Sequence, residues 1–334
     1  MRAIAVTAPS SAKLIEIPDI SPVGGEALLR VRMIGLCGTD LNTFRGKNPM
    51  VTYPRVLGHE VAASLEADVY PFASGTDVTL SPYSACGHCP SCRSGRANAC
   101  QFNQTLGVQR DGALTERISV PPEKLYSAAL SLEELCLVEP LTVGFHAAAR
   151  AQVKASDTVA VFGCGGVGLG AISGAAFRGS RVIAIDRDDE KLEIARKAGA
   201  TETIHSGKED LHMRLQTLTE QAGPDCTIEA IGVPETFRAA VEEVAFSGRV
   251  VYIGYAKEPV SYETRLFVQK ELQIFGSRNA LPEDFREVIR MLEMKRFPVE
   301  DAISAVVPLE ETPDMLKQWS ENPQKFTKIM VRVS

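Results

Sequence analysis

Short apolar runs separated by proline and glycine occupy the first third of the chain. Runs of this length between turn residues are typical of β-strands, and their irregular spacing favours a barrel-like, β-rich domain over a parallel sheet. Turns are expected at residues 21–25 and 48–55, where proline, glycine and asparagine gather. The expected strands are residues 3–6, 14–17, 27–35, 61–65, 77–80 and 113–120.

From residue 159 onward, apolar runs alternate with stretches of helical periodicity. Such alternation predicts right-handed βαβ units on a parallel sheet. We therefore expect an α/β protein with two domains, which a length of 334 residues also suggests. The expected strands are residues 159–162, a run ending at 186, 225–230, 249–253 and 272–275, and the expected helices are one starting near 166, 189–198 and 235–245.

Helical periodicity also runs from residue 132 to 149, on both sides of Pro140. Within it, Glu139 places a carboxylate in apolar surroundings, which is unfavourable unless the carboxylate has a partner. An exposed glutamate at a helix end is the alternative. In the tail we expect helices at 284–294 and 313–320 and a last strand at 328–333, which would return to the first domain.

A glycine-rich turn follows the apolar run that ends at residue 162. Gly163 allows the chain to turn sharply, Gly165 allows the backbone to approach a pyrophosphate, and Gly168 allows the helix to lie against the sheet. The phosphates would sit at the N-terminus of the helix that starts near Gly166 and Val167, where free amides and the helix dipole favour anions. This pattern predicts a dinucleotide-binding loop.

Asp186 ends the next strand, 18 residues after the last of these glycines. A carboxylate at this point can bond the hydroxyls of an adenosine ribose and would repel a 2′-phosphate, so we expect NAD in preference to NADP. Arg187 is the residue that keeps the alternative open, because an arginine can hold that phosphate.

A cysteine-rich loop follows the predicted β-strands. Cys86, Cys89 and Cys92 are spaced three residues apart, and Cys100 comes eight residues later in a segment rich in Gly, Pro, Ser and Asn. Four thiolates around zinc would order such a loop, which has little apolar core of its own. Disulfides and an iron-sulfur cluster are the alternatives. Since four thiolates complete a tetrahedral site, we expect His88 to be exposed.

Two further motifs contain metal-binding residue types. Cys37 is followed by Asp40 within the sequence CGTD, and His59 is followed by Glu60 within GHE. Zinc accepts thiolate, imidazole and carboxylate ligands, and Asp40 could orient a histidine ligand. A small buried cysteine and an ordinary hydrogen-bonded histidine are equally compatible with these residues alone.

Composition narrows the class of protein. Hydrophobic residues make up 45% and charged residues 23%, as in soluble globular proteins, and no apolar run approaches the ~20 residues that span a bilayer. The N-terminus has no secretory signal pattern, so we expect a cytoplasmic protein whose eight cysteines are thiols or metal ligands. A net charge of −6 argues against nonspecific binding of nucleic acid, and no membrane partner is expected.

Taken together, the motifs resemble those of the zinc-dependent medium-chain alcohol dehydrogenases, in particular the sorbitol, threonine and sugar-acid dehydrogenases. The resemblance implies a GroES-like catalytic domain formed by residues 1–140 and 277–334, with a Rossmann NAD-binding domain at residues 141–276. It also implies a homo-oligomer, a dimer or tetramer. The matching stretches are CGTD at Cys37, GHE at Gly58, the four-cysteine loop, VEPLTVGFHA at Val138, GCGGVG at Gly163 and IDRD around Asp186.

By this resemblance the chain holds two zinc ions, one structural in the four-cysteine loop and one catalytic at Cys37 and His59. The third catalytic ligand is Glu60 in some relatives and the position of Glu139 in others, so both remain candidates. Zinc with an open position lowers the pKa of bound water from about 15.7 towards 7, and a bound alcohol should respond in the same way. Hydride transfer then requires the bound alcohol and the nicotinamide ring to lie close together.

The resemblance also assigns Thr39 as the hydroxyl that accepts the substrate proton. Many relatives carry a histidine three residues later to pass the proton outward, but here that residue is Asn42, which cannot titrate. The proton would leave through water, the ribose or a carboxylate such as Glu60.

The leading hypothesis is an NAD-dependent dehydrogenase that oxidises a secondary alcohol of a polyol or sugar acid, such as a hexonate. A threonine or simple alcohol dehydrogenase is the alternative enzyme, and a protein that binds NAD and zinc without turnover is the alternative outside enzymes. Candidates for binding a substrate carboxylate are Arg45, Arg110 and Arg278, each of which could equally be a solvated surface residue.

Overall fold

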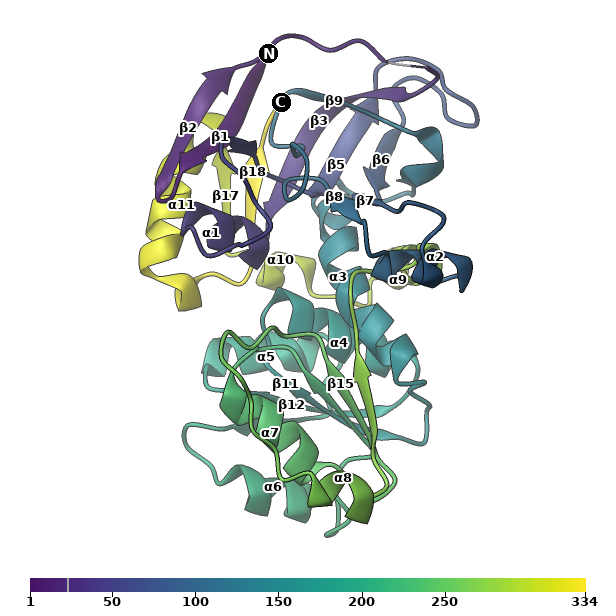
Figure 1. The fold of residues 1–334 in the computed structure, drawn as a ribbon, viewed down its shortest axis with the longest axis vertical. Coiled ribbons are helices and arrows are strands. Elements are labelled where there is room, and N and C mark those ends of the chain that lie inside the picture. Colours follow the sequence, from purple (N-terminus) through teal and green to yellow (C-terminus); the bar gives the residue numbers. More distant parts are fainter. Residues whose placement is uncertain (23) are drawn as a thin grey trace. The chain divides into compact units, whose positions relative to one another are not determined.

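The computed structural model describes residues 1–22 and 24–334, which form two compact units. Unit 1 comprises Met1–Glu139 and Val299–Ser334, and unit 2 comprises Pro140–Pro298 (Figure 1). The C-terminal segment thus returns to the N-terminal unit, as expected. The second division falls after Pro298 and not at residue 277, so the segment between these points belongs to unit 2.

Helix α9 (Pro282–Glu293) explains this difference from the expected boundary. Its apolar face is buried, and its Asp284 accepts a hydrogen bond from His146 of unit 2, with Nδ1 and Oδ2 2.8 Å apart. The periodicity of the segment predicts a helix but not the unit against which the helix packs. The apolar residues of α9 that are buried are Phe285, Val288, Met291 and Leu292.

Unit 1 is built mainly from antiparallel strands. A seven-stranded sheet has the order β10-β6-β5-β3-β18-β17, with β9 also paired to β3, and a second sheet has the order β2-β1-β4. The C-terminal strand β18, yellow in Figure 1, pairs antiparallel with β3, with Ile329 opposite Leu36. The strands are β1 (Arg2–Ala8), β2 (Ser11–Glu16), β3 (Ala27–Leu36), β4 (Arg55–Val56), β5 (Glu60–Leu65), β6 (Asp77–Leu80), β7 (Tyr83–Ser84), β8 (Gln104–Thr105), β9 (Arg117–Val120), β10 (Leu125–Ser127), β17 (Ala305–Pro308) and β18 (Ile329–Arg332).

Short helices lie at the ends of these strands. Helix α1 follows β3 directly, with Cys37 as its N-cap, and α11 contributes Trp319 to the apolar core of the unit. The helices are α1 (Gly38–Phe44), α2 (Pro90–Arg93), α10 (Val299–Ala302) and α11 (Thr312–Glu321).

Unit 2 contains a six-stranded sheet in which every pairing is parallel, in the order β13-β12-β11-β14-β15-β16. In chain order this is 3-2-1-4-5-6, the arrangement of dinucleotide-binding folds, and it confirms the predicted α/β class. The strands are β11 (Thr158–Phe162), β12 (Arg181–Asp186), β13 (Glu202–His205), β14 (Cys226–Glu229), β15 (Arg249–Tyr252) and β16 (Gln273–Gly276). The helices besides α9 are α4 (Gly166–Phe177), α5 (Asp189–Lys197), α6 (Leu211–Leu218), α7 (Pro234–Glu243) and α8 (Arg265–Gln269).

Helix α3 (Leu132–Arg150) continues through Pro140 without a break. Glu139 therefore lies in the middle of a helix and is only 3% exposed. The alternative of an exposed glutamate at a helix end is wrong. None of the helices in the described part of the chain is both long enough and apolar enough to cross a membrane.

Candidate active site

The four cysteines of the loop between β7 and β8 converge. Their sulfur atoms all lie within 4.8 Å of one another, and none of them forms a disulfide. Backbone amides of Cys86 and Phe102 point at the sulfur of Cys100, each 3.3 Å away. Hydrogen bonds from the Ser91 hydroxyl and from backbone amides lower the pKa of the Cys89 thiol to about 5, whereas burial raises the pKa of the neighbouring Cys92 thiol to about 12, so Cys89 is the thiol of this pair that ionises first.

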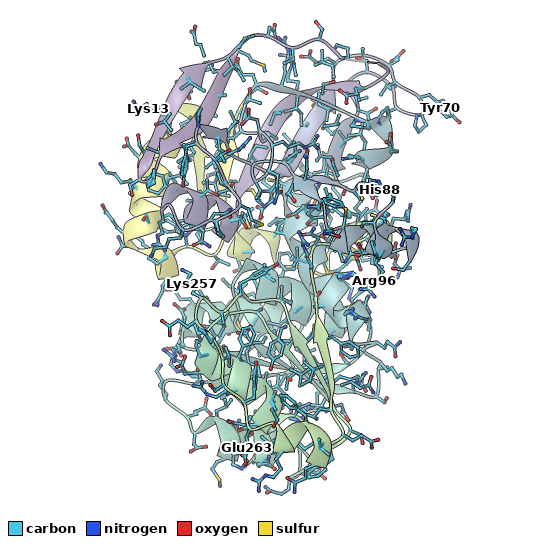
Figure 2. All side chains as sticks on the ribbon, in the orientation of Figure 1. Lys13, Tyr70, His88, Arg96, Lys257 and Glu263 are labelled. Atoms are coloured by element: carbon cyan, nitrogen blue, oxygen red, sulfur yellow. The ribbon has the colours of Figure 1, made fainter. Side chains whose placement is uncertain are left out.

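His88 lies inside this loop and is exposed, as predicted (Figure 2). Its Nδ1 is 2.8 Å from the carbonyl oxygen of Cys86, and it is not part of the four-sulfur cluster. The donor set therefore fits a closed, four-thiolate zinc site.

A second cluster forms where β3, α1 and β5 meet. Cys37 is the N-cap of α1, His59 immediately precedes β5, and Glu60 is the first residue of β5. The sulfur of Cys37, a ring nitrogen of His59 and a carboxylate oxygen of Glu60 all lie within 4.8 Å of one another. The sequence motifs CGTD and GHE predict these donor types, and the fold brings the two motifs together.

Asp40 links the two segments through their backbones. Its carboxylate accepts hydrogen bonds from the amide of Cys37 at 2.8 Å and from the amide of Gly58 at 3.3 Å. The distance from Asp40 Oδ1 to Nδ1 of His59 is 4.0 Å, too long for a hydrogen bond. Asp40 thus holds the two backbone segments and forms an ion pair with the imidazole without a hydrogen bond, and its suggested role in orienting a histidine ligand stays a prediction.

Lys328 provides a partner for Glu60 that sequence reasoning missed. Its Nζ lies 2.6 Å from each carboxylate oxygen of Glu60, and both side chains are buried. Burial alone would lower the pKa of Lys328, but the charges of Glu60 and Cys37 outweigh it and raise that pKa. Lys328 therefore carries a charge, and removing one partner of such a pair costs about 3–5 kcal/mol.

The space for the Glu60 carboxylate is created by a glycine. Gly35 of β3 is the register partner of Glu60 in β5. An added Cβ at Gly35 would lie 2.0 Å from Glu60 Oε2, far inside van der Waals contact. Gly35 therefore belongs to the site because any larger side chain would collide with Glu60. In the sequence it is only a glycine within an apolar run.

Replacing Gly35 with alanine is expected to displace this carboxylate. Since Glu60 cannot move away without leaving Lys328, we expect kcat/KM for alcohol oxidation to fall by roughly 10- to 100-fold, as when groups that orient metal ligands are disturbed. The measurements are NADH formation and zinc content per chain. Gly276→Ala is the control, because its Cβ would meet no atom within 4 Å and its φ is not positive. A fully active Gly35→Ala protein would contradict the assignment.

Glu139 approaches the same cluster from α3. The hydroxyl of Tyr83 in β7 donates a hydrogen bond to Glu139 Oε1. Burial, and then the charge of Glu139, raises the pKa of Tyr83 well above its usual range, so the hydroxyl is protonated and acts as the donor. Burial likewise raises the pKa of Glu139.

The charge balance of this cluster fits a bound cation. Burial alone would lower the pKa of His59, yet the nearby charges of Asp40 and Cys37 outweigh it and raise that pKa well above its usual range. His59 Nδ1 is buried and has no hydrogen-bond partner in the described part of the chain. A divalent metal would balance the excess of acidic groups, and thiolate, imidazole and carboxylate are the ligands that zinc takes.

The residues of the cluster differ in exposure. Cys37 and Thr39 are half-buried, whereas His59 and Glu60 are buried. The Thr39 hydroxyl lies 3.7 Å from the sulfur of Cys37, so a substrate hydroxyl at the metal would be within its reach. The role expected of Thr39 stays a prediction.

The glycine-rich turn of unit 2 has the geometry that a dinucleotide requires. Gly163 has a φ of +97°, and a Cβ on Gly168 would lie 1.9 Å from the carbonyl oxygen of Gly163. A Cβ on Gly165 would meet no atom within 4 Å, so open space remains where a pyrophosphate would approach. Helix α4 begins at Gly166, with Val167 half-buried in its first turn.

Asp186 lies beside this turn, at the end of β12. Its Oδ2 accepts a hydrogen bond from the amide of Cys164 at 2.7 Å, and its Oδ1 accepts one from the amide of Arg187. Asp186 is half-buried and Arg187 is exposed. The carboxylate is therefore held at the rim of the glycine turn, where an adenosine ribose is expected to lie.

Comparison with known proteins identifies both units. Residues 24–129 match the model of the alcohol dehydrogenase GroES-like domain, and residues 166–294 match that of the zinc-binding dehydrogenases. The chain is 33% identical to L-galactonate-5-dehydrogenase of Escherichia coli K12, over 83% of this chain and 82% of that protein. It is 31% identical to sorbitol dehydrogenase of Bacillus subtilis 168, over 95% of this chain and 92% of that protein.

The chain belongs to the zinc-binding alcohol dehydrogenase family. A crystal structure of an alcohol dehydrogenase from Escherichia coli CFT073, complexed with NADH, has a TM-score of 0.91 at 28% identity and covers 100% of this chain and 99% of that one. Membership in this family makes the protein a zinc-type oxidoreductase that uses a nicotinamide cofactor. It also confirms the GroES-like and Rossmann architectures.

In this zinc-binding alcohol dehydrogenase, the three candidate arginines differ. Arg45 donates to the hydroxyl and carbonyl oxygens of Ser320, so it ties α1 to α11. Arg278 is half-buried in unit 2. Arg110 is half-buried in unit 1, and its Nε and Nη2 have no hydrogen-bond partner among the described residues. Of the two candidate arginines in unit 1, Arg45 and Arg110, Arg110 is thus the better candidate for binding an anion.

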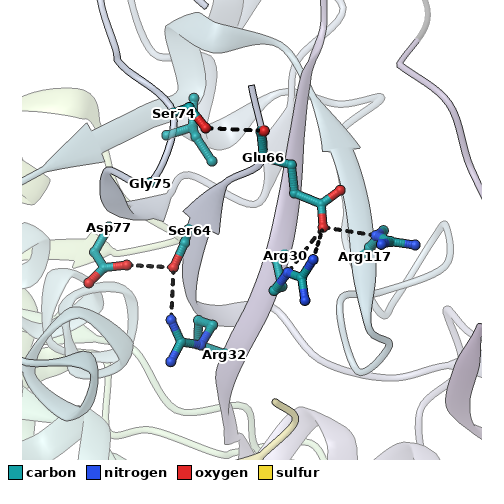
Figure 3. Close-up of a pocket in the computed structure, with 9 residues that line it drawn as sticks. Arg30, Arg32, Ser64, Glu66, Ser74, Gly75, Asp77 and Arg117 are labelled. Atoms are coloured by element: carbon teal, nitrogen blue, oxygen red, sulfur yellow. Dashed lines mark hydrogen bonds and ion pairs between the residues drawn. The ribbon is translucent and has the colours of Figure 1, made fainter. Parts of the chain in front are cut away.

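A groove of about 570 Å³ on unit 1 contains none of the predicted site residues. Its arginines already have partners, because Arg30 and Arg117 both pair with Glu66, and Arg32 donates to Ser64 (Figure 3). We assign it no part in the chemistry.

Proposed function

We propose that the protein is an NAD-dependent dehydrogenase that oxidises a secondary alcohol of a polyol or sugar acid, with a catalytic zinc held by Cys37, His59 and Glu60. The observation that carries the proposal is the convergence of these three donors within 4.8 Å. Relatives named for galactonate and sorbitol support the substrate class. A second zinc in the four-cysteine loop and a homo-oligomer in the cytoplasm complete the proposal.

Different residues of the chain would have different roles in the reaction. A zinc at this site supplies Lewis acidity, which lowers the pKa of a bound hydroxyl. Thr39 would accept that hydroxyl's proton, since its own hydroxyl lies beside Cys37. Lys328 balances the charge of Glu60 and holds both of its oxygens. With Asn42 in the place of a histidine, the proton would continue through water, the ribose or a carboxylate.

The preference for NAD rests on Asp186. Its carboxylate is fixed at the glycine turn by the amides of Cys164 and Arg187, where it would bond ribose hydroxyls and repel a 2′-phosphate. The exposed Arg187 is the residue that could reverse this preference.

The direct test is a substrate panel with the purified protein. We expect NADH formation with hexonates or polyols, at a kcat/KM for NAD at least about tenfold above that for NADP, which is a difference of about 1.4 kcal/mol. The panel includes ethanol and L-threonine. Turnover of either of these with no turnover of polyols or sugar acids would contradict the substrate class, and NAD binding without any turnover would indicate a non-enzymatic protein.

A further inference from the structure

The two carboxylates near the proposed metal site have different partners. Glu60 belongs to the cluster whose donor atoms lie within 4.8 Å of one another, and Lys328 holds both of its oxygens. Glu139 is not in that cluster as the described residues form it, although it lies close enough to interact with the charges of His59 and Glu60. The hydroxyl of Tyr83 donates to Glu139 instead.

Tyr83 is itself held firmly. It lies in β7, a strand of two residues that pairs with β8, where Tyr83 is opposite Thr105. Lys124 Nζ donates to the carbonyl oxygen of Tyr83 at 2.9 Å and to the hydroxyl of Ser84 at 2.5 Å. Strand β7 is thus held both by its pairing with β8 and by Lys124, and the Tyr83 hydroxyl donates to Glu139 from this strand.

We propose that Tyr83 is a positioning residue that holds Glu139 beside the catalytic metal and not on it, so that the donor set is Cys37, His59 and Glu60 and one position stays open for the alcohol. The proposal rests on the proposed function, because it requires a metal at Cys37. It explains how two buried glutamates can approach one ion while a single one serves as ligand.

The physical reason lies in the alternatives open to a buried carboxylate. Ionised carboxylates inside a protein need hydrogen-bond donors or cations. When Tyr83 loses its hydroxyl, Glu139 is left one donor short, and the metal is the cation that can replace it. Glu139 would then add a further ligand to the metal, which raises its coordination number from four to five and crowds the position that the alcohol needs.

The test uses the full-length protein, stripped with a chelator and reloaded with Co²⁺, whose visible bands are intense in four-coordinate sites and weaker in five-coordinate ones. Because Co²⁺ also enters the four-cysteine loop, each spectrum is taken as a difference against Cys37→Ser. We expect Tyr83→Phe to weaken the bands and to lower kcat/KM by roughly 10- to 100-fold. The double variant Tyr83→Phe/Glu139→Gln should restore the bands.

Two controls make the result specific. Tyr53→Phe removes another hydroxyl of unit 1, one that donates to the Thr43 carbonyl oxygen at 2.6 Å, and should leave the bands unchanged. Glu139→Gln alone should also leave them unchanged, which tests the proposal even where Tyr83→Phe does not fold.

Three outcomes would overturn the proposal: unchanged bands in Tyr83→Phe, weak bands that persist in the double variant, or altered bands in Glu139→Gln. The proposed function fails in a different way, by the absence of any Co²⁺ bands in wild-type protein that depend on Cys37.

Discussion

Replacing Cys37 with serine should abolish turnover while the fold persists. The thiolate is one of three protein donors to the proposed metal, and a bound metal contributes several kcal/mol to stabilisation of the transition state, so its loss lowers kcat/KM by roughly a thousandfold or more. Zinc content should fall from two ions to one per chain. Circular dichroism should be unchanged, because Cys37 is half-buried and lies at the start of a short helix.

The matched control for this variant is Cys226→Ala. Cys226 is a buried thiol in β14 of unit 2 and belongs to neither cysteine cluster. The Cys226→Ala variant should retain both zinc ions and full activity. Turnover that persists in Cys37→Ser, or two zinc ions per chain in that variant, would show that the metal assignment is wrong.

Replacing Cys92 with serine should lower the stability of the protein but leave its catalytic rate unchanged. The loop from Cys86 to Cys100 has few buried apolar side chains, so its order depends on four thiolates around one ion. Loss of that ion should lower the melting temperature by about 10 °C, the shift that several kcal/mol produces in a chain of this size. Molecules that remain folded should keep their kcat.

His88→Ala is the control within the same loop. Because His88 is exposed and lies outside the four-sulfur cluster, the melting temperature should change by less than about 2 °C. Calorimetry and zinc analysis distinguish the two variants. If Cys92→Ser melted at the same temperature as the wild type, the proposed structural role of this zinc would be wrong.

Residues close together in the chain were predictable from the sequence alone. The four cysteines span 15 residues, from Cys86 to Cys100, and the glycines of the dinucleotide turn span six, from Gly163 to Gly168. In such segments the spacing along the chain limits the geometry, so residue types identify the chemistry. The alternation of strands and helices likewise predicted the parallel sheet, whose order is confirmed.

Other features of the site depend on segments that only folding brings together. Lys328 and Glu60 are 268 residues apart, and Tyr83 and Glu139 are 56 apart. A lysine before the last strand and a tyrosine before a cysteine loop have no periodicity or spacing that indicates a buried partner. The role of Gly35 could not be predicted from the sequence either. Its missing side chain leaves space for the Glu60 carboxylate on the neighbouring strand, and only the strand pairing reveals this.

The sequence by itself thus determined the class of fold, the four-cysteine loop and the glycine-rich turn, because these follow from local spacing and from the period of apolar residues. Tertiary structure decided which carboxylate joins Cys37 and His59, which unit holds α9, and which side chains neutralise the buried acids. The physical reason is that a buried charge must be satisfied by whatever group packing brings near it, and packing joins residues that are distant along the chain.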